Sequence, residues 1–316
     1  MIDGIEKPKI SIVTPSFNSE KYIEETIKSV VNQGYENYEY IIMDGGSTDG
    51  TVEIIRKYDS IINDNQKFRW FSEKDGGQTD AVNKGLRLCT GEWFAFLNSD
   101  DYYMPGLFID IAPFLKANSD KGVVYGNQYV IYEGIEQKYN LLKKPSDSFT
   151  LNDILYANQV FGPASFYNMK ALKAAGEFDT SLYHWMDWDM YIRIMKLMPF
   201  KYIDYNMTVF RISTGMKSPS NPDNKARYKK FQKEAHHVSV KNGGHYFSGK
   251  WLQKYQLYGK YKYYLRRYEK EPGVMAHDKQ DNAKINALFM AAAVSVHYLV
   301  FPMMALIKRV RKARIK

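Results

Sequence analysis

The chain has 316 residues, of which 45% are hydrophobic and 25% are charged. These proportions are ordinary for a globular protein and exclude a wholly disordered or collagen-like chain. The length indicates two domains, or one large domain with an appendage. The single cysteine, Cys89, excludes an internal disulfide and is typical of a reducing compartment.

Positive charge is concentrated in the last part of the chain, although the net charge is only +9. Residues 225–316 carry 21 Lys and Arg against 5 Asp and Glu, whereas the remainder carries 23 against 30. A basic segment of this kind favours a polyanion such as nucleic acid, anionic lipid or an acidic glycan. The alternative interpretation is a solvated basic face.

Short apolar runs alternate with segments of helical period through the first 125 residues. The apolar runs predict strands at 10–14, 40–43, 68–71, 93–97 and 123–125. The helical period is found in the segments 23–31, 51–58 and 80–88. This alternation indicates βαβ units and therefore an α/β fold, a Rossmann-like and mostly parallel sheet flanked by helices.

The rest of the chain has a mixed pattern and then a change of composition. Helices are predicted at 150–157, 169–175 and 187–198, and strands around 202–203 and 209–210. After a loop at 217–223, helices are predicted at 224–240 and 250–270, followed by an apolar stretch at 285–307 and a basic end. We therefore divide the chain into residues 1–220, a basic helical region 221–284, and residues 285–316.

Acidic and Gly-rich segments follow the predicted strands, where open α/β sheets bind ligands. Asp44 begins the run Asp44–Thr51, whose glycines allow the backbone to approach a ligand closely. In the segment Glu73–Gly85, Asp80 and Asn83 lie one helical turn apart and can share a ligand face. Each pattern alone fits a plain Asp/Gly turn or a capped surface helix equally well.

The predicted strand 93–97 ends in Asn98-Ser99-Asp100-Asp101. Two adjacent acids at the tip of a buried strand are costly without a cation. Oxygen ligands and few histidines favour Mg²⁺ or Mn²⁺ over zinc. Such an ion could neutralise a diphosphate leaving group.

A fourth acidic cluster joins Gly176–Asp179 to Met186-Asp187-Trp188-Asp189 at a helix start. The helix dipole favours carboxylates there whatever their task. Asp187 is also a candidate general base, because its tryptophan neighbours exclude water and can raise the pKa of a carboxyl group.

Together, in this order and spacing, these segments resemble the family 2 glycosyltransferases, which have the GT-A fold. The resemblance covers roughly residues 8–215 and includes the run Thr14-Pro15-Ser16-Phe17-Asn18. It implies an inverting, metal-dependent enzyme that moves a sugar from a nucleoside diphosphate, with a UDP-sugar favoured. The implied acceptor is a glycan or lipid-linked glycan in surface polysaccharide synthesis.

The resemblance also assigns roles to single residues. Asp187 would deprotonate the acceptor hydroxyl, although Met186 stands where the family usually has Glu. Asp100 would be the main protein ligand of Mn²⁺ or Mg²⁺, in a motif where Asn98 replaces the first Asp. The nucleotide would be bound by Pro15, Ser16, Asn18, Asp44, Asp75, Asp80, Asn98 and Ser99. The secondary candidates are Asp101, Asn83, Arg211 and Lys217.

One departure lies after the last predicted core strand. Relatives often have an Arg-x-His stretch there, whereas this chain has Arg211-Ile212-Ser213. The implied metal or phosphate contact of the histidine is therefore doubtful, and Arg211 or Lys217 would hold the diphosphate instead.

The basic C-terminal region interleaves tyrosines with Lys and Arg over residues 254–268. This mixture suits a membrane interface, and without any nucleic-acid-binding motif we expect no nucleic acid partner. Residues 285–307 are long enough to span a bilayer, but a span would place the basic end opposite the cytosolic catalytic domain. We expect a cytoplasmic protein held peripherally at the inner face of the cell membrane by an in-plane helix. Packing on a domain or partner, and spanning, are the alternatives.

Two other classes of protein compete with the glycosyltransferase interpretation. A nucleotidyltransferase would need a Gly-rich, basic loop after the first strand, and Pro15–Asn18 is not one. A non-catalytic glycan-binding or scaffold protein could keep the GT-A fold, but the presence of both Asp100 and Asp187 argues against it.

Overall fold

The computed structural model describes residues 7–132, 139–140, 149–212 and 225–244. Contacts divide the chain into a compact unit, Met1–Gly243, and a second unit, Gly244–Lys316. Lys217 and the predicted segments 250–270 and 285–316 lie outside the described residues. Among the residues that are described, no helix is long and apolar enough to cross a membrane.

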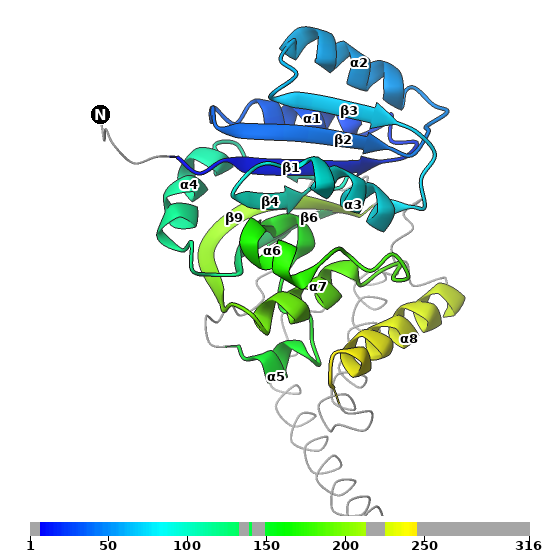
Figure 1. Ribbon diagram of the computed structural model, residues 1–316. Helices are drawn as coiled ribbons and strands as arrows, with labels where there is room; N and C mark the ends of the chain where they lie inside the picture. Colours follow the sequence, from blue (N-terminus) through cyan, green and yellow to red (C-terminus); the bar gives the residue numbers. More distant parts are fainter. Residues whose placement is uncertain (1–6, 133–138, 141–148, 213–224, 245–316) are drawn as a thin grey trace, which may run out of the picture. The chain divides into compact units, whose positions relative to one another are not determined.

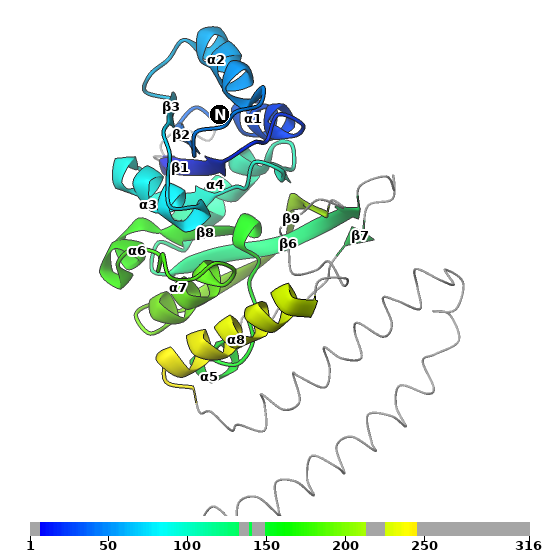
Figure 2. The ribbon, with the colours of Figure 1, turned by 90° about the vertical axis from the view of Figure 1, so that its right-hand side faces the viewer.

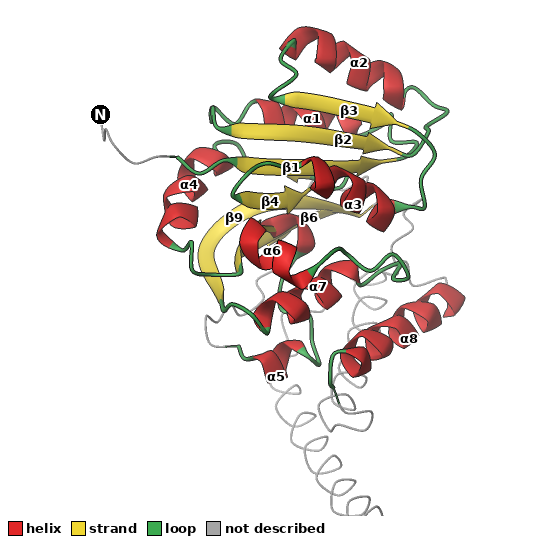
Figure 3. Ribbon diagram, viewed as in Figure 1, coloured by secondary structure: helices red, strands yellow, loops and turns green. Residues whose placement is uncertain are grey.

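One sheet of nine strands forms the centre of the described part of the first unit (Figures 1 and 3). Its order is β3-β2-β1-β4-β8-β6-β9-β5, with β7 beside β6. The first four strands of this order are parallel, and β8 runs antiparallel between β4 and β6. The bounds are β1 Ile10–Ser16, β2 Tyr38–Asp44, β3 Phe68–Ser72, β4 Trp93–Phe96, β5 Tyr102–Tyr103, β6 Val123–Tyr132, β7 Tyr139–Asn140, β8 Ser165–Asn168 and β9 Phe200–Ile212.

Helices cover both faces of this sheet. In Figures 1 and 2, α3, α6 and α7 lie on one face, and α1 and α4 lie on the other. The bounds are α1 Ile23–Val31, α2 Thr51–Ile62, α3 Gln78–Leu88, α4 Leu107–Ala117, α5 Leu151–Ile154, α6 Met169–Ala175, α7 Met186–Met195 and α8 Lys225–Lys241, with a 3-10 turn at Gly162–Ala164. The packing of α3 on β1 is close, since a Cβ at Gly85 would lie 2.5 Å from Val13 Cγ1.

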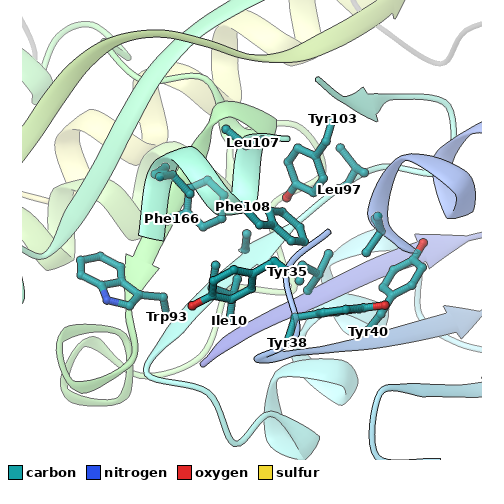
Figure 4. Close-up of a cluster of buried hydrophobic side chains, with 14 of the residues drawn as sticks. Ile10, Tyr35, Tyr38, Tyr40, Trp93, Leu97, Tyr103, Leu107, Phe108 and Phe166 are labelled. Carbon is teal, nitrogen blue, oxygen red and sulfur yellow. The ribbon is translucent and has the colours of Figure 1, made fainter. Parts of the chain in front are cut away.

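The core lies on both sides of the sheet. On the side of α1 and α4, residues such as Ile10 and Tyr40 of the parallel strands pack with Phe108 of α4 (Figure 4). On the other side, rings of β4 and β8 meet Phe178, which lies 5.9 Å from Phe96 and 6.0 Å from Tyr167. Burial on both faces explains why β1, β2 and β4 are nearly continuous apolar runs in the sequence.

The predicted α/β class and the five N-terminal strands are confirmed. Sequence reasoning missed α4, β5, β7 and β8, and treated β9 as two strands. It also made two helices too long, since α5 ends at Ile154 and α7 ends at Met195. The predicted helix at 224–240 is α8, and the contacts place it in the first unit, which continues past residue 220 to Gly243.

Candidate active site

The carboxyl ends of the parallel strands meet at one edge of the sheet (Figure 1). In the strand register, Ser16 of β1 lies beside Asp44 of β2, and Asp44 lies beside Ser72 of β3. The ends of these strands, together with the loops that follow them and β4, carry most of the predicted nucleotide-binding residues. The structure therefore brings these residues to the edge where α/β sheets bind ligands.

Asp44 is a buried carboxylate that shapes its own loop. Its Oδ2 accepts hydrogen bonds from Gly46 N at 3.1 Å, Ser47 N at 2.9 Å and Ser72 Oγ at 2.6 Å. Its Oδ1 accepts one from Ser47 Oγ at 2.5 Å. Sequence reasoning missed both serines, because the link to Ser72 depends on strand register. A nucleotide contact by Asp44 stays a prediction.

Asn18 joins the loop after β1 to the loop after β2. Its backbone has a φ of 48°, a left-handed conformation that asparagine tolerates. Asn18 N donates to Ser47 Oγ at 2.8 Å, and Thr48 N donates to Asn18 Oδ1 at 2.9 Å. Next to this junction, the buried Ser16 Oγ has no hydrogen-bond partner within the described structure. Such a hydroxyl is costly unless a ligand uses it.

Asp75 and Asp80 both organise the entry to α3. Asp75 Oδ1 accepts a hydrogen bond from Gly77 N at 2.8 Å, and its Oδ2 would lie 2.9 Å from a Cβ at Gly45. Asp80 Oδ2 accepts one from Gly76 N at 3.0 Å. This hydrogen bond, together with the charge of Lys84, lowers the pKa of Asp80. Asp75 therefore lies against the loop after β2, whereas Asp80 binds the loop after β3, and a nucleotide contact by either acid stays a prediction.

The two acids after β4 have different environments. Asp101 is fully buried, and it accepts hydrogen bonds from Asn98 Nδ2 at 3.0 Å and Arg211 N at 3.0 Å. Burial, and then the charge of Asp100, raise the pKa of Asp101 well above its ordinary value. Asp100 is partly exposed, and desolvation raises its pKa too. Asp101 thus holds the loop together, whereas Asp100 is the acid that solvent can reach.

Asn98 and Ser99 link this loop to its neighbours. Gln78 Nε2 of α3 donates to Asn98 Oδ1 at 2.7 Å, and Ser99 Oγ lies 2.7 Å from Ser19 Oγ. The hydroxyl of Ser19 was not among the predicted site residues. These contacts place the tip of β4 between α3 and the start of α1.

The residues present fit a metal ion only in part. Within the described ranges, no group of three His, Cys, Asp or Glu side chains could hold an ion. Magnesium in phosphate-transfer sites is often held by one or two carboxylates, with substrate phosphates and water completing its shell. Asp100 would suit that kind of site, and its role as a metal ligand stays a prediction.

Arg211 is a secondary candidate whose guanidinium is already engaged. It forms an ion pair with Glu25, donates from Nε to the carbonyl oxygen of Asp100 at 3.1 Å, and lies 4.5 Å from the centre of the Tyr22 ring. These contacts join the tip of β4 to α1. A role of Arg211 toward a diphosphate stays a prediction, because it would require an exchange of partners.

Asp187 lies in the first turn of α7. A Cβ at Gly162 would be 3.2 Å from Asp187 Oδ2 and 3.2 Å from Phe96 Cζ, so the carboxylate and the ring of the last residue of β4 both border Gly162. Burial, and then the charges of Tyr191 and Asp187, raise the pKa of Tyr167. Burial and the charge of Asp187 likewise raise the pKa of Tyr191. The aromatic surroundings predicted for Asp187 therefore include two tyrosines that sequence reasoning missed.

Asn83 differs from the expectation that it shares a ligand face with Asp80. Its side chain is 1% exposed, and both ends of its amide bind the backbone of Phe178. Nδ2 donates to Phe178 O at 2.8 Å, and Phe178 N donates to Oδ1 at 2.9 Å. Asn83 therefore ties α3 to the Gly176–Asp179 segment, and Arg87 supports this link through two hydrogen bonds to Glu177, at 2.6 and 2.7 Å.

The fold is the GT-A fold, which solved glycosyltransferase structures share. TarS from S. aureus in complex with UDP-GlcNAc matches 73% of this chain and 66% of its own, with a TM-score of 0.56 and 22% identity. The mannosyltransferase PcManGT from Pyrobaculum calidifontis, in complex with GDP-Man and Mn²⁺, matches 75% of this chain and 66% of its own, with a TM-score of 0.56 and 17% identity.

The chain belongs to glycosyl transferase family 2, whose sequence profile matches residues 11–174. Among curated relatives, chondroitin synthase from Escherichia coli is 29% identical over 216 residues, which are 66% of this chain and 30% of that protein. The chain spans about a third of the length of these relatives. It covers 30% of chondroitin synthase and 36% of each of two Rickettsia glycosyltransferases.

We predict that Asn83→Ala lowers the free energy of unfolding by about 2–3 kcal/mol, because it leaves the buried N–H and C=O of Phe178 without partners. Urea denaturation measures the change. The control is Lys84→Ala, which removes surface ion pairs with Glu73 and Asp80 and should cost at most about 1 kcal/mol. Equal unfolding midpoints for the two variants would contradict a structural role for Asn83.

Proposed function

We propose that the protein is an inverting glycosyltransferase that transfers a sugar from a nucleoside diphosphate, with UDP favoured, to a hydroxyl of a glycan or lipid-linked glycan. The observation that carries this proposal is the position of two acids at the end of one strand. Asp100 follows β4 by four residues, and Asp187 borders Gly162, which Phe96, the last residue of β4, borders too. A donor site and an acceptor site can thus share this strand end.

The donor class is supported by the loops and by the solved neighbours. The edge of the sheet combines the partnerless Ser16 hydroxyl with the carboxylates of Asp75 and Asp80, groups that suit hydroxyl and N–H donors of a nucleoside. TarS is solved with UDP-GlcNAc and PcManGT with GDP-Man and Mn²⁺, at identities that support the fold alone. Synthesis of a polysaccharide is supported by the relation to chondroitin synthase.

In the proposed reaction, Asp187 accepts the proton of an acceptor hydroxyl. The acceptor oxygen forms a bond to the anomeric carbon while the bond from that carbon to the diphosphate breaks, so the configuration inverts. Asp100 would hold a divalent ion together with the diphosphate, and such an ion supplies positive charge that stabilises the leaving group. The buried rings around Phe96 and Tyr167 exclude water from the side of Asp187 that faces the core.

We predict that UDP or GDP raises the melting temperature in the presence of Mn²⁺, and that Asp100→Ala loses the metal-dependent part of the shift. Ligand at 100 times its dissociation constant adds about 2.7 kcal/mol to stability, which thermal denaturation readily detects. Asp120→Ala, an exposed acid paired with Lys121, is the control and should behave as the parent chain. An equal metal-dependent shift of the melting temperature in the parent chain, Asp100→Ala and Asp120→Ala would overturn the role of Asp100.

We predict that Asp187→Asn keeps the affinity for the nucleotide but lowers sugar transfer at least about 100-fold, because only the proton acceptor is lost. Release of UDP from UDP-GlcNAc, with Mn²⁺ and with or without an acceptor glycan, measures the effect. If the parent chain also binds the nucleotide but releases no UDP, the result would favour a non-catalytic glycan-binding protein. Full turnover by the variant would remove Asp187 from the mechanism.

We also propose that the chain associates with the inner face of a membrane. The positive charge of residues 225–316 supports this proposal, because it attracts anionic lipid. We predict that deleting residues 285–316 reduces co-sedimentation with vesicles that contain anionic lipid by at least about tenfold, since each basic residue near the surface adds about 1 kcal/mol of attraction. Raised salt should weaken the binding of the full chain. Undiminished binding of the truncated chain would contradict this proposal.

A further inference from the structure

Helix α8 lies after the segment that matches the family, residues 11–174, and packs beside α7 (Figures 1 and 2). The contact is formed by aromatic rings and by hydrogen bonds to the backbone. The rings of Trp185 and Phe231 are 4.4 Å apart, and Trp185 Nε1 donates to the carbonyl oxygen of Phe231 at 3.0 Å. α8 thus contacts the chain immediately before the helix that carries Asp187.

Glu234 of α8 caps the start of α7 from outside. Its Oε1 accepts hydrogen bonds from His184 N at 2.6 Å and from Trp185 N at 2.9 Å. Trp185 is the N-cap residue, directly before α7 begins at Met186, and its own side chain forms no capping hydrogen bond. The N–H groups at the start of a helix need partners, and a negative charge is favoured there by the helix dipole. Glu234 binds the N–H of Trp185 and that of the residue before it, and it brings its negative charge to this end of α7.

The C-terminal end of α8 holds α7 at a second point. Asp189 is fully buried, and its Oδ1 lies 2.8 Å from Asn242 Nδ2 and 3.1 Å from Lys241 Nζ. Lys241 Nζ also lies 2.5 Å from Asp179 Oδ2. Burial alone would raise the pKa of Asp179, but hydrogen bonds from Lys241 and Ser181 lower it to about 2. Lys241 therefore joins Asp179 to Asp189, and so links the two acidic segments proposed for the acceptor side.

We propose that α8 positions the catalytic base, and that Glu234 is the positioning residue that sets the place of Asp187. Asp187 stands between the two points that α8 holds, residues 184–185 before it and Asp189 after it. A general base must lie within hydrogen-bond reach of the proton that it takes, and a displacement of about 1 Å can cost about 100-fold in rate. The inference rests on the proposed role of Asp187.

The test measures release of UDP or GDP from UDP-GlcNAc, UDP-glucose or GDP-mannose with Mn²⁺, in which water replaces the acceptor. We expect Glu234→Ala to lower kcat about 10- to 100-fold without changing the thermal shift produced by UDP and Mn²⁺. Glu234→Gln keeps an oxygen that accepts both hydrogen bonds and should recover most of the rate. Lys233→Ala, at the exposed neighbouring position, is the matched control and should match the parent chain.

A double substitution separates positioning from plain stabilisation. If Glu234 acts through Asp187, Glu234→Ala should cause no further loss in a chain that already carries Asp187→Asn. A full additional loss in that background would overturn the inference. Asn242→Ala, which removes a hydrogen bond to Asp189, is the second variant if Glu234→Ala does not fold, and it should lower kcat with the same UDP affinity.

The outcomes distinguish this inference from the function on which it rests. Parent-level kcat in Glu234→Ala and in Asn242→Ala, while Asp187→Asn is inactive, would overturn the positioning role and leave the proposed function intact. Absence of turnover by the parent chain with every donor, or full activity of Asp187→Asn, would overturn the proposed function and this inference with it.

Discussion

The close approach of Gly162 to Phe96 and Asp187 is the constraint that joins the two halves of the candidate site. Even a Cβ at Gly162 would crowd both neighbours at 3.2 Å. β8 follows directly from this turn and inserts antiparallel between β4 and β6, so the segment proposed for the acceptor side is built into the sheet that carries the proposed donor side. Phe178, held by Asn83, packs under the same strand end.

Several acids at the site stabilise its loops, which explains how polar groups persist at the end of a buried sheet. Asp44 accepts four hydrogen bonds from its own loop and from β3, and Asp101 binds Asn98 and the backbone of Arg211. A buried carboxylate is tolerated when donors surround it in this way. Loops fixed by such hydrogen bonds can hold Asp100 at a defined position, although Asp100 lies in no helix or strand.

Hydrophobic period predicted the parallel strands well, because strands buried on both faces are apolar runs, and the ends of these strands mark the edge where such sheets bind ligands. The same reasoning failed where pairing is long-range or the pattern is uninformative. β8 has only four residues and depends on partners distant in sequence, and α4 is apolar on most sides with Pro113 inside it. Spacing put Asn83 near Asp80, but spacing cannot show that Phe178 covers that face.

The proposed acceptor side depends on parts of the chain that lie beyond the segment matched by the family profile. The family profile ends at residue 174, whereas Asp187 and the residues of α8 that hold α7 lie after it. The side chain of Trp185 does not cap α7, and the backbone N–H of Trp185 is bound instead by Glu234 of the last helix of the compact unit. Composition marked that helix only as basic. Two of its charged residues instead make contacts within the compact unit. Lys241 pairs with Asp189 of α7, and Glu234 accepts hydrogen bonds from the backbone just before α7.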